Sequence, residues 1–233
     1  MKYIITLLLT LSIVNVANAQ NKWFSVYNDS TALVSDANEI IHQMSERVGR
    51  VNADIKLDNI TAIKNTTPYL IYIDGATVNI PMWEEVIPAQ KKFFAEVAGG
   101  ENEGRAVFGL FFNGFYIAHE LGHSIAASAG KKFDNAFDSE YDANVMAVLY
   151  WRTTKEKDKL ETCYTYAKKM LETLKNPVPE NENYKKYITE HYNELGADPY
   201  KYGYIQFSQF VEIYENKSLP DFDTFIKNYI KPE

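Results

Sequence analysis

Two histidines and one glutamate share a single pentapeptide, His-Glu-Leu-Gly-His. His119 and His123 lie four residues apart, so on a helix their imidazoles would share one face, one turn apart. Two neutral imidazoles are suitable zinc ligands, with bond lengths of about 2.0–2.1 Å. Glu120, one position further round, could take a proton from a water molecule at the metal's open position and later pass it to a leaving amine. The segment therefore predicts a zinc site, with Glu120 as its general base.

A zinc ion that activates water needs a third protein ligand. An extended histidine motif would place Gly and His where the chain has Ala126 and Ala129. The two remaining histidines, His42 and His191, are remote in the sequence. Glu140 lies seventeen residues after the pentapeptide's second histidine, which lets one helix end, turn and return as an antiparallel neighbour. We therefore expect Glu140 to be the third ligand; the alternative is a solvated carboxylate on a helix.

The segment that carries Glu140 also offers a partner for one of the histidines. Asn144 stands one turn beyond Glu140 on the same helix face. Asp142 points the other way, and Asp138 lies near the helix start, where it could be a cap. The side-chain oxygen of Asn144 could accept the second ring N–H of a ligand histidine and so orient that ring.

These two segments resemble the gluzincin metallopeptidases, in which H-E-x-x-H on one helix is completed by a glutamate on the next helix. Residues 119–123 match the first half, and residues 140–144, Glu-Tyr-Asp-Ala-Asn, match the second half. The Ala-Asn ending is more similar to small secreted gluzincin-related peptidases than to thermolysin, which has Asp there. The resemblance covers residues 107–152, about a fifth of the chain. It implies a zincin-like fold, a zinc cofactor, and hydrolysis of peptide bonds in a peptide or protein substrate.

The resemblance implies two further parts of the site. Gluzincins add a later His or Tyr that stabilises the oxyanion. His191 is one candidate for this role, and the others are Tyr192, Tyr202 and Tyr204; no spacing selects among them. The strand before the active-site helix would form the edge along which an extended substrate lies, and residues 76–80 are the candidate for it.

The elements that must position these residues follow from hydrophobic periodicity. Residues 107–129 form a long, almost uncharged run that ends at Gly130, which predicts a buried central helix carrying the pentapeptide. Strand patterns precede this helix, and helical patterns follow it. The order predicts an α+β fold in one domain, residues 20–233, with a sheet in the half up to about residue 130 and a helical C-terminal half.

Strands are expected at 51–57 and in a hairpin formed by 69–73 and 76–80. Helices other than the central one are expected at 31–48, 83–97, 136–152, 155–174, 183–194, 199–215 and 220–230. Pro88 either interrupts the helix at 83–97 or marks its true start.

The start of the chain has the pattern of a cleaved export signal: Lys2, an apolar run, and Ala-Asn-Ala at 17–19. We expect residues 1–19 to be a signal peptide and the mature chain to be periplasmic or extracellular. No other stretch is apolar enough to span a membrane. The formal charge of −7, without a basic run, argues against nucleic acid as a partner. Cys163, the only cysteine, is expected to be a packed side chain, and the oligomeric state is left open.

Two other functions are compatible with the same residues. A zinc hydrolase of a non-protein amide would use the same Lewis-acid and base chemistry. An exported binding or scaffold protein could retain a zincin-like site without catalysis. Against this second alternative, a structural zinc needs no general base such as Glu120, and it prefers four protein ligands where only three are evident.

Overall fold

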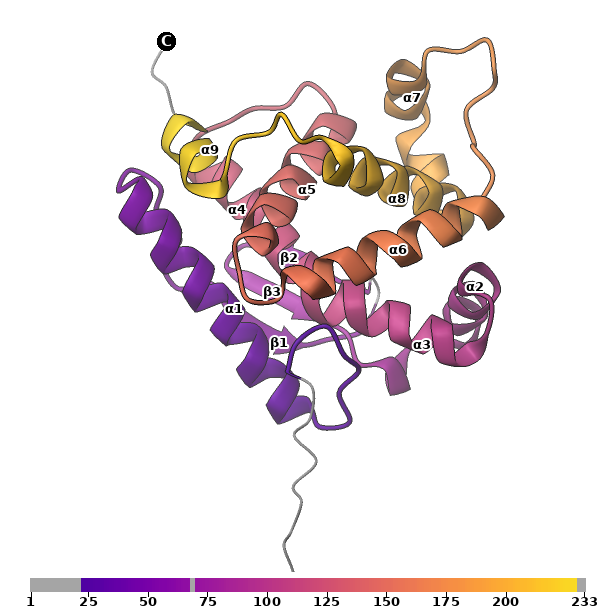
Figure 1. The fold of residues 1–233 in the computed structure, drawn as a ribbon, viewed down its shortest axis with the longest axis horizontal. Helices are drawn as coiled ribbons and strands as arrows, with labels where there is room; N and C mark the ends of the chain where they lie inside the picture. Colours follow the sequence, from indigo (N-terminus) through magenta and orange to yellow (C-terminus); the bar gives the residue numbers. More distant parts are fainter. Residues whose placement is uncertain (1–21, 68–69, 230–233) are drawn as a thin grey trace, which may run out of the picture.

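The structure is a computed structural model, and it describes residues 22–67 and 70–229 (Figure 1). It is mostly helical, with a small three-stranded sheet in the N-terminal half, which confirms the predicted α+β class. The predicted signal peptide, residues 1–19, lies outside the described residues. In chain order the elements are α1 (Ser30–Val51), β1 (Thr61–Lys64), β2 (Tyr72–Asp74), β3 (Thr77–Ile80), the 3-10 helix η1 (Trp83–Glu85), α2 (Pro88–Ala98), α3 (Glu101–Leu110), the π-helical turn η2 (Phe111–Phe115), α4 (Tyr116–Ser128), α5 (Ala136–Arg152), α6 (Lys157–Thr173), α7 (Tyr184–Gly196), α8 (Pro199–Glu215) and α9 (Phe222–Tyr229).

The three strands are arranged in the order β1-β3-β2. β2 and β3 form the predicted hairpin, and Gly75 takes the positive φ of 57° that its tight turn requires. β1 pairs with the other side of β3 in parallel, with Thr61 opposite Thr77. The prediction that residues 76–80 form a substrate-binding edge is therefore wrong, because β3 is paired on both sides. The edge strand of the hairpin is β2.

The strand predicted at residues 51–57 is also wrong. α1 continues to Val51, and Asn52 ends it. The Asn52 side-chain oxygen accepts the backbone N–H of Asp54 at 3.1 Å, in a local turn that competes with strand formation. Of the apolar residues that alternate there, Ile55 alone is fully buried, so the pattern reflects one anchoring side chain.

The helix predicted at residues 107–129 is interrupted in the structure, although its hydrophobic pattern is uniform. Between α3 and α4 the turn η2 is π-helical, which interrupts the regular ladder of backbone hydrogen bonds. The backbone N–H of Phe24 donates to the Asn113 carbonyl at 3.1 Å, and the Trp151 indole N–H donates to the Phe115 carbonyl at 3.4 Å. These contacts hold the start of α4 against the N-terminal segment and α5.

α5 returns beside α4 in the antiparallel direction, as the sequence predicts. The start of α4 meets the later part of α5, where His119 contacts Asn144, and its middle meets the earlier part, where His123 lies by Glu140. A Cβ at Gly122 would lie 2.9 Å from the Ala143 Cα, so the two backbones approach too closely for a larger residue. This close approach brings the two motif segments together.

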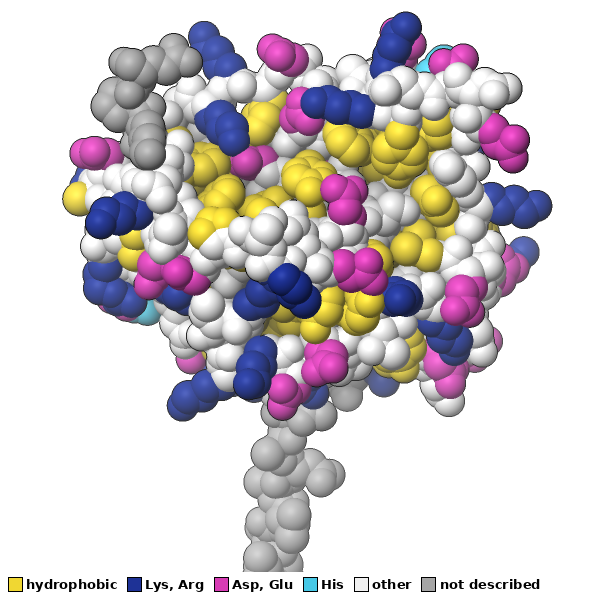
Figure 2. Space-filling model, turned by 45° about the horizontal axis from the view of Figure 1, so that its top comes forward, with side chains coloured by type: hydrophobic (Ala, Val, Ile, Leu, Met, Phe, Trp, Pro, Cys, Tyr) yellow, Lys and Arg dark blue, Asp and Glu magenta, His cyan; other side chains and the backbone are white. Residues whose placement is uncertain are grey.

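α4 is buried on nearly all sides, as predicted for the helix that carries the pentapeptide. Between residues 116 and 126, His123 and Ser124 are half-buried and all others are buried. No helix within the described ranges has both the length and the hydropathy that crossing a bilayer requires. On the face shown in Figure 2, acidic and basic side chains lie close to one another, and hydrophobic side chains are exposed between them.

Candidate metal centre

Three side chains with metal-binding atoms converge between α4 and α5. The Nε2 atom of His119 lies 3.2 Å from Nε2 of His123 and 3.4 Å from Oε2 of Glu140. The Nε2 atom of His123 lies 3.7 Å from Oε1 of Glu140. The structure thus brings together, in one cluster, the three residues that the sequence predicts as metal ligands.

The spacing of these atoms fits a single metal ion. In a tetrahedral site with bonds of about 2.0–2.1 Å, neighbouring ligand atoms lie about 3.3–3.4 Å apart. The observed separations of 3.2, 3.4 and 3.7 Å agree with this geometry. Two ring nitrogens that face each other can share only one proton, so a cation satisfies the cluster better than hydrogen bonds within it. The three residues could therefore hold a metal ion and leave one coordination position open.

Each histidine has a partner for the ring nitrogen that points away from the cluster. The Asn144 side-chain oxygen lies 2.9 Å from Nδ1 of His119, which is the contact that the sequence predicts. The Ser139 hydroxyl lies 3.4 Å from Nδ1 of His123, a contact that was not predicted. Both partners hold a ring so that its Nε2 atom faces the other ligands.

Glu120 is buried next to this cluster, with 7% of its surface exposed. Its carboxylate accepts the backbone N–H of Ile73, in the edge strand β2, and interacts electrostatically with His119 and Glu140. Burial raises the pKa of the Glu120 carboxyl to about 7, against the opposing attraction of His119. A general base is most effective when its pKa lies near the working pH, so the environment of Glu120 suits proton transfer.

In the metal-free protein, the three candidate ligands have different protonation states because their pKa values are shifted in different directions. Burial alone would raise the pKa of Glu140, but the hydrogen bond and charge of His119 lower it to about 2. Burial would lower the pKa of His119, but Glu140 raises it above its usual value. Burial, together with the charge of His119, lowers the pKa of His123 to about 4. Below neutral pH, His119 is therefore the ligand that carries a proton.

Zinc binding at pH 6 is expected to release one proton from the ligands and up to one more from Glu120. His119 has a pKa raised above its usual value, whereas His123 and Glu140, with pKa values of about 4 and about 2, are already deprotonated. Glu120, with a pKa of about 7, is mostly protonated at that pH in the metal-free protein. Calorimetric titration in two buffers of different ionisation enthalpy counts the released protons. Glu120→Gln should lower the count by up to one, and zinc binding without proton release would contradict this pattern.

α8 adds polar side chains behind the cluster that the sequence analysis did not identify. The Gln206 side-chain amide donates to Oε2 of Glu140 at 3.0 Å. The Asn144 side-chain amide donates to the Gln206 oxygen at 3.2 Å and to the Gln209 oxygen at 3.1 Å. A signal for this face exists in the sequence, because Tyr202, Gln206 and Gln209 recur at helical spacing among apolar residues.

Two of the tyrosines predicted as candidates for stabilising the oxyanion lie close to the Glu140 carboxylate. The Tyr192 hydroxyl is hydrogen-bonded to Glu140 and to the Tyr202 hydroxyl. Tyr204 lies elsewhere along α8, where it interacts with Tyr184. Burial raises the pKa of Tyr192 to about 12, so its hydroxyl keeps its proton and can act as a donor.

His191 has a different environment from its neighbour Tyr192. Its ring packs against Tyr187, with 4.4 Å between the ring centroids, and its Nδ1 atom lies 4.0 Å from Glu194. Both partners belong to α7, the helix of His191 itself. A catalytic role for His191 stays a prediction.

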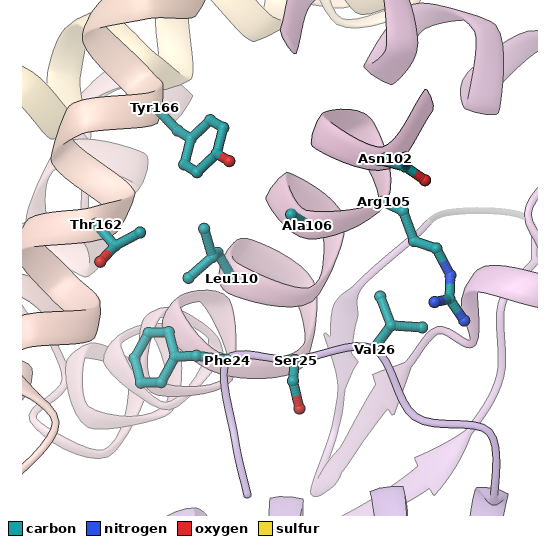
Figure 3. Close-up of a pocket in the computed structure, with 9 residues that line it drawn as sticks. All are labelled: Phe24, Ser25, Val26, Asn102, Arg105, Ala106, Leu110, Thr162 and Tyr166. Carbon is teal, nitrogen blue, oxygen red and sulfur yellow. The ribbon is translucent and has the colours of Figure 1, made fainter. Parts of the chain in front are cut away.

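A separate hollow of about 410 Å³ lies between the N-terminal segment, α3 and α6 (Figure 3). Its lining is mostly apolar and includes Phe24 and Leu110. The charged side chain in its wall, Arg105, donates to Asn28 and Glu84. Because no histidine, cysteine or carboxylate is among the described residues that line it, the hollow lacks the groups that the metal cluster provides.

Comparison of the chain with protein-family models, curated proteins and solved structures finds no match.

Proposed function

We propose that this protein is a zinc-dependent metallopeptidase with a zincin-like site of the gluzincin type. The observation that carries the proposal is a buried carboxylate, Glu120, next to two histidines and a glutamate with tetrahedral spacing. A structural zinc site needs no base and prefers four protein ligands, whereas a catalytic site has three and keeps one position open. The arrangement of Glu120 and the cluster favours the second kind of site.

Zinc suits the donor set, because two imidazoles and one carboxylate are the ligands of many catalytic zinc sites. His119, His123 and Glu140 would hold the ion. When bound, zinc would supply Lewis acidity, which polarises the carbonyl to be cleaved and lowers the pKa of a water molecule.

The other residues of the site would move protons and stabilise charge. The Glu120 carboxylate would take a proton from the attacking water and pass it to the nitrogen of the leaving amine. The Ile73 N–H keeps that carboxylate oriented. The Tyr192 hydroxyl, close to Glu140, would donate to an oxyanion, and His191 is one of the alternatives that the sequence offers.

The substrate would be a peptide or protein in an extended conformation. β2 is an edge strand, and its Ile73 N–H reaches the general base, so this edge of the sheet borders the site. An extended peptide can add to such an edge through main-chain hydrogen bonds. The proposal includes export of the protein through the signal peptide at residues 1–19, to the periplasm or the outside of the cell.

Zinc content and peptide cleavage test the proposal together. Elemental mass spectrometry of residues 20–233 is expected to find about one zinc per chain. A library of quenched fluorescent peptides should be cleaved, with activity lost to a zinc chelator and restored by zinc. Zinc without any cleavage would favour a binding or scaffold protein, and cleavage of non-peptide amides alone would favour the other hydrolase. A chain that takes up no zinc would refute the proposal.

A further inference from the structure

Two glutamines of α8 are buried against the metal cluster. Gln206 is 5% exposed and Gln209 is 1% exposed, on the side of α8 that packs against α5. A buried amide is unfavourable unless its N–H and C=O groups are hydrogen-bonded. Both side chains have such partners, and the partners include a metal-binding residue.

The hydrogen bonds around Gln206 have a single consistent direction. A carboxylate that binds a metal carries no proton, so Glu140 can only accept, and the NH₂ group of Gln206 must face it, at 3.0 Å. The Gln206 oxygen then accepts from the NH₂ group of Asn144 at 3.2 Å. The Asn144 oxygen consequently faces Nδ1 of His119 at 2.9 Å and requires a proton on that nitrogen. His119 is left to bind the metal through Nε2, the nitrogen directed at the cluster.

The remaining N–H groups of these amides are also used, which excludes the flipped orientations. The second N–H of Gln206 donates to the Tyr202 hydroxyl at 2.8 Å, and the second N–H of Asn144 donates to Gln209 at 3.1 Å. Tyr202 is in turn hydrogen-bonded to Tyr192, whose hydroxyl is hydrogen-bonded to the ligand carboxylate. A flip of Asn144 would place its oxygen against the oxygens of Gln206 and Gln209. A flip of Gln206 would place its oxygen against Glu140 and its NH₂ group against that of Asn144.

We propose that Gln206 is a positioning residue of the metal centre, which links the ligand Glu140 to Asn144 and thereby fixes the ring tautomer and orientation of the ligand His119. The inference rests on the proposed metal site. Glu140 and Asn144 lie one turn apart on α5, and Gln206 spans both from the opposite helix. α8 thus completes a site whose ligands all come from α4 and α5.

The same network gives a physical reason for Asn at position 144. In an Asn144→Asp variant, the carboxylate would face the side-chain oxygens of Gln206 and Gln209, which accept hydrogen bonds from the native amide. To donate to the new carboxylate, Gln206 would have to turn its own oxygen toward Glu140. That contact would be repulsive, so the direction of the Gln206 amide makes Asn the compatible residue.

Zinc affinity in two matched variants tests the role of Gln206. Gln206→Met keeps the side-chain length and removes the amide. Gln209→Met is the control, because Gln209 is equally buried on the same helix and bonded to Asn144 but not to Glu140. We expect Gln206→Met to weaken zinc binding by about 10–100-fold, the usual effect of removing a group that orients a metal ligand, and Gln209→Met to weaken it less. The Kd is measured by competition with a chromophoric chelator.

The absorption spectrum of the Co²⁺-substituted protein is a second measurement, which would not change if Gln206 only stabilised the fold. The visible absorption of Co²⁺ depends on ligand geometry, so Gln206→Met should alter the bands while Gln209→Met stays close to wild type. Circular dichroism shows whether each metal-free variant is folded. Should Gln206→Met fail to fold, Gln206→Asn replaces it, because the shorter amide cannot span Glu140 and Asn144 together.

A wild-type Kd and cobalt spectrum in the folded Gln206 variant would overturn the assignment, as would equal losses in the two glutamine variants. Neither the zinc Kd nor the cobalt spectrum depends on peptide cleavage. A chain that binds zinc but cleaves no peptide would therefore refute the proposed function and leave the role of Gln206 intact.

Discussion

Replacing Glu120 by glutamine is expected to slow peptide hydrolysis by about 10²–10⁴-fold while the protein keeps about one zinc per chain. Glutamine has nearly the size of glutamate and can still accept the Ile73 N–H, but it cannot take a proton from water. The pKa of Glu120 is raised to about 7, so the buried pocket already accommodates a neutral side chain. The measurements are kcat at saturating peptide and the zinc content of the same preparation.

Glu212 provides a matched control for this substitution. It is an exposed carboxylate on α8 that accepts the Tyr141 hydroxyl at 3.0 Å, outside the metal cluster. Glu212→Gln should therefore cleave peptides at the wild-type rate. If zinc-loaded Glu120→Gln also cleaved at that rate, Glu120 would be excluded as the general base.

The convergence of His119, His123 and Glu140 was predictable because it depends on short-range rules. A four-residue spacing places two side chains on one helix face, and a short connection makes consecutive helices antiparallel neighbours. Asn144 follows from Glu140 by the same helical spacing. Gly122 adds a local reason, since its missing side chain permits the close contact of α4 with α5.

The features that could not be predicted from the sequence depend mostly on contacts between segments that are distant along the chain. Gln206 lies 66 residues after Glu140, and nothing in the local pattern of α8 says which helix its polar face meets. The central position of β3 depends on its pairing with β1, which no turn signal specifies. The π-helical turn η2 could not be predicted because residues 107–129 form one almost uncharged run, so a local change of helical period is not visible in the hydrophobic pattern.

Replacing Glu140 by alanine is expected to weaken zinc binding by at least about 10²–10³-fold, because removing one member of a buried charged pair costs about 3–5 kcal/mol. Two neutral imidazoles would remain, without a negative charge to balance the ion. The pKa of Glu140 is lowered to about 2, so this carboxylate is ionised throughout the range in which the protein would be assayed. Zinc lost in mild acid should therefore reflect protonation of His119, whose pKa is raised, whereas loss in Glu140→Ala should persist at pH 8.

An Asp142→Ala variant is the control that distinguishes the loss of a metal ligand from the loss of any negative charge on α5. Asp142 lies two positions from Glu140 but is bonded to Lys131 at 2.8 Å and to the Tyr229 hydroxyl, so its side chain points away from the cluster. Asp142→Ala removes the same charge from the same helix and should keep the wild-type zinc Kd. Equal zinc loss in the two variants would mean that α5 acts through its overall charge. If Glu140→Ala kept the wild-type zinc Kd, the third ligand would have to be another residue. Glu140 would then be excluded, despite its helical spacing and its 3.4 Å contact with His119.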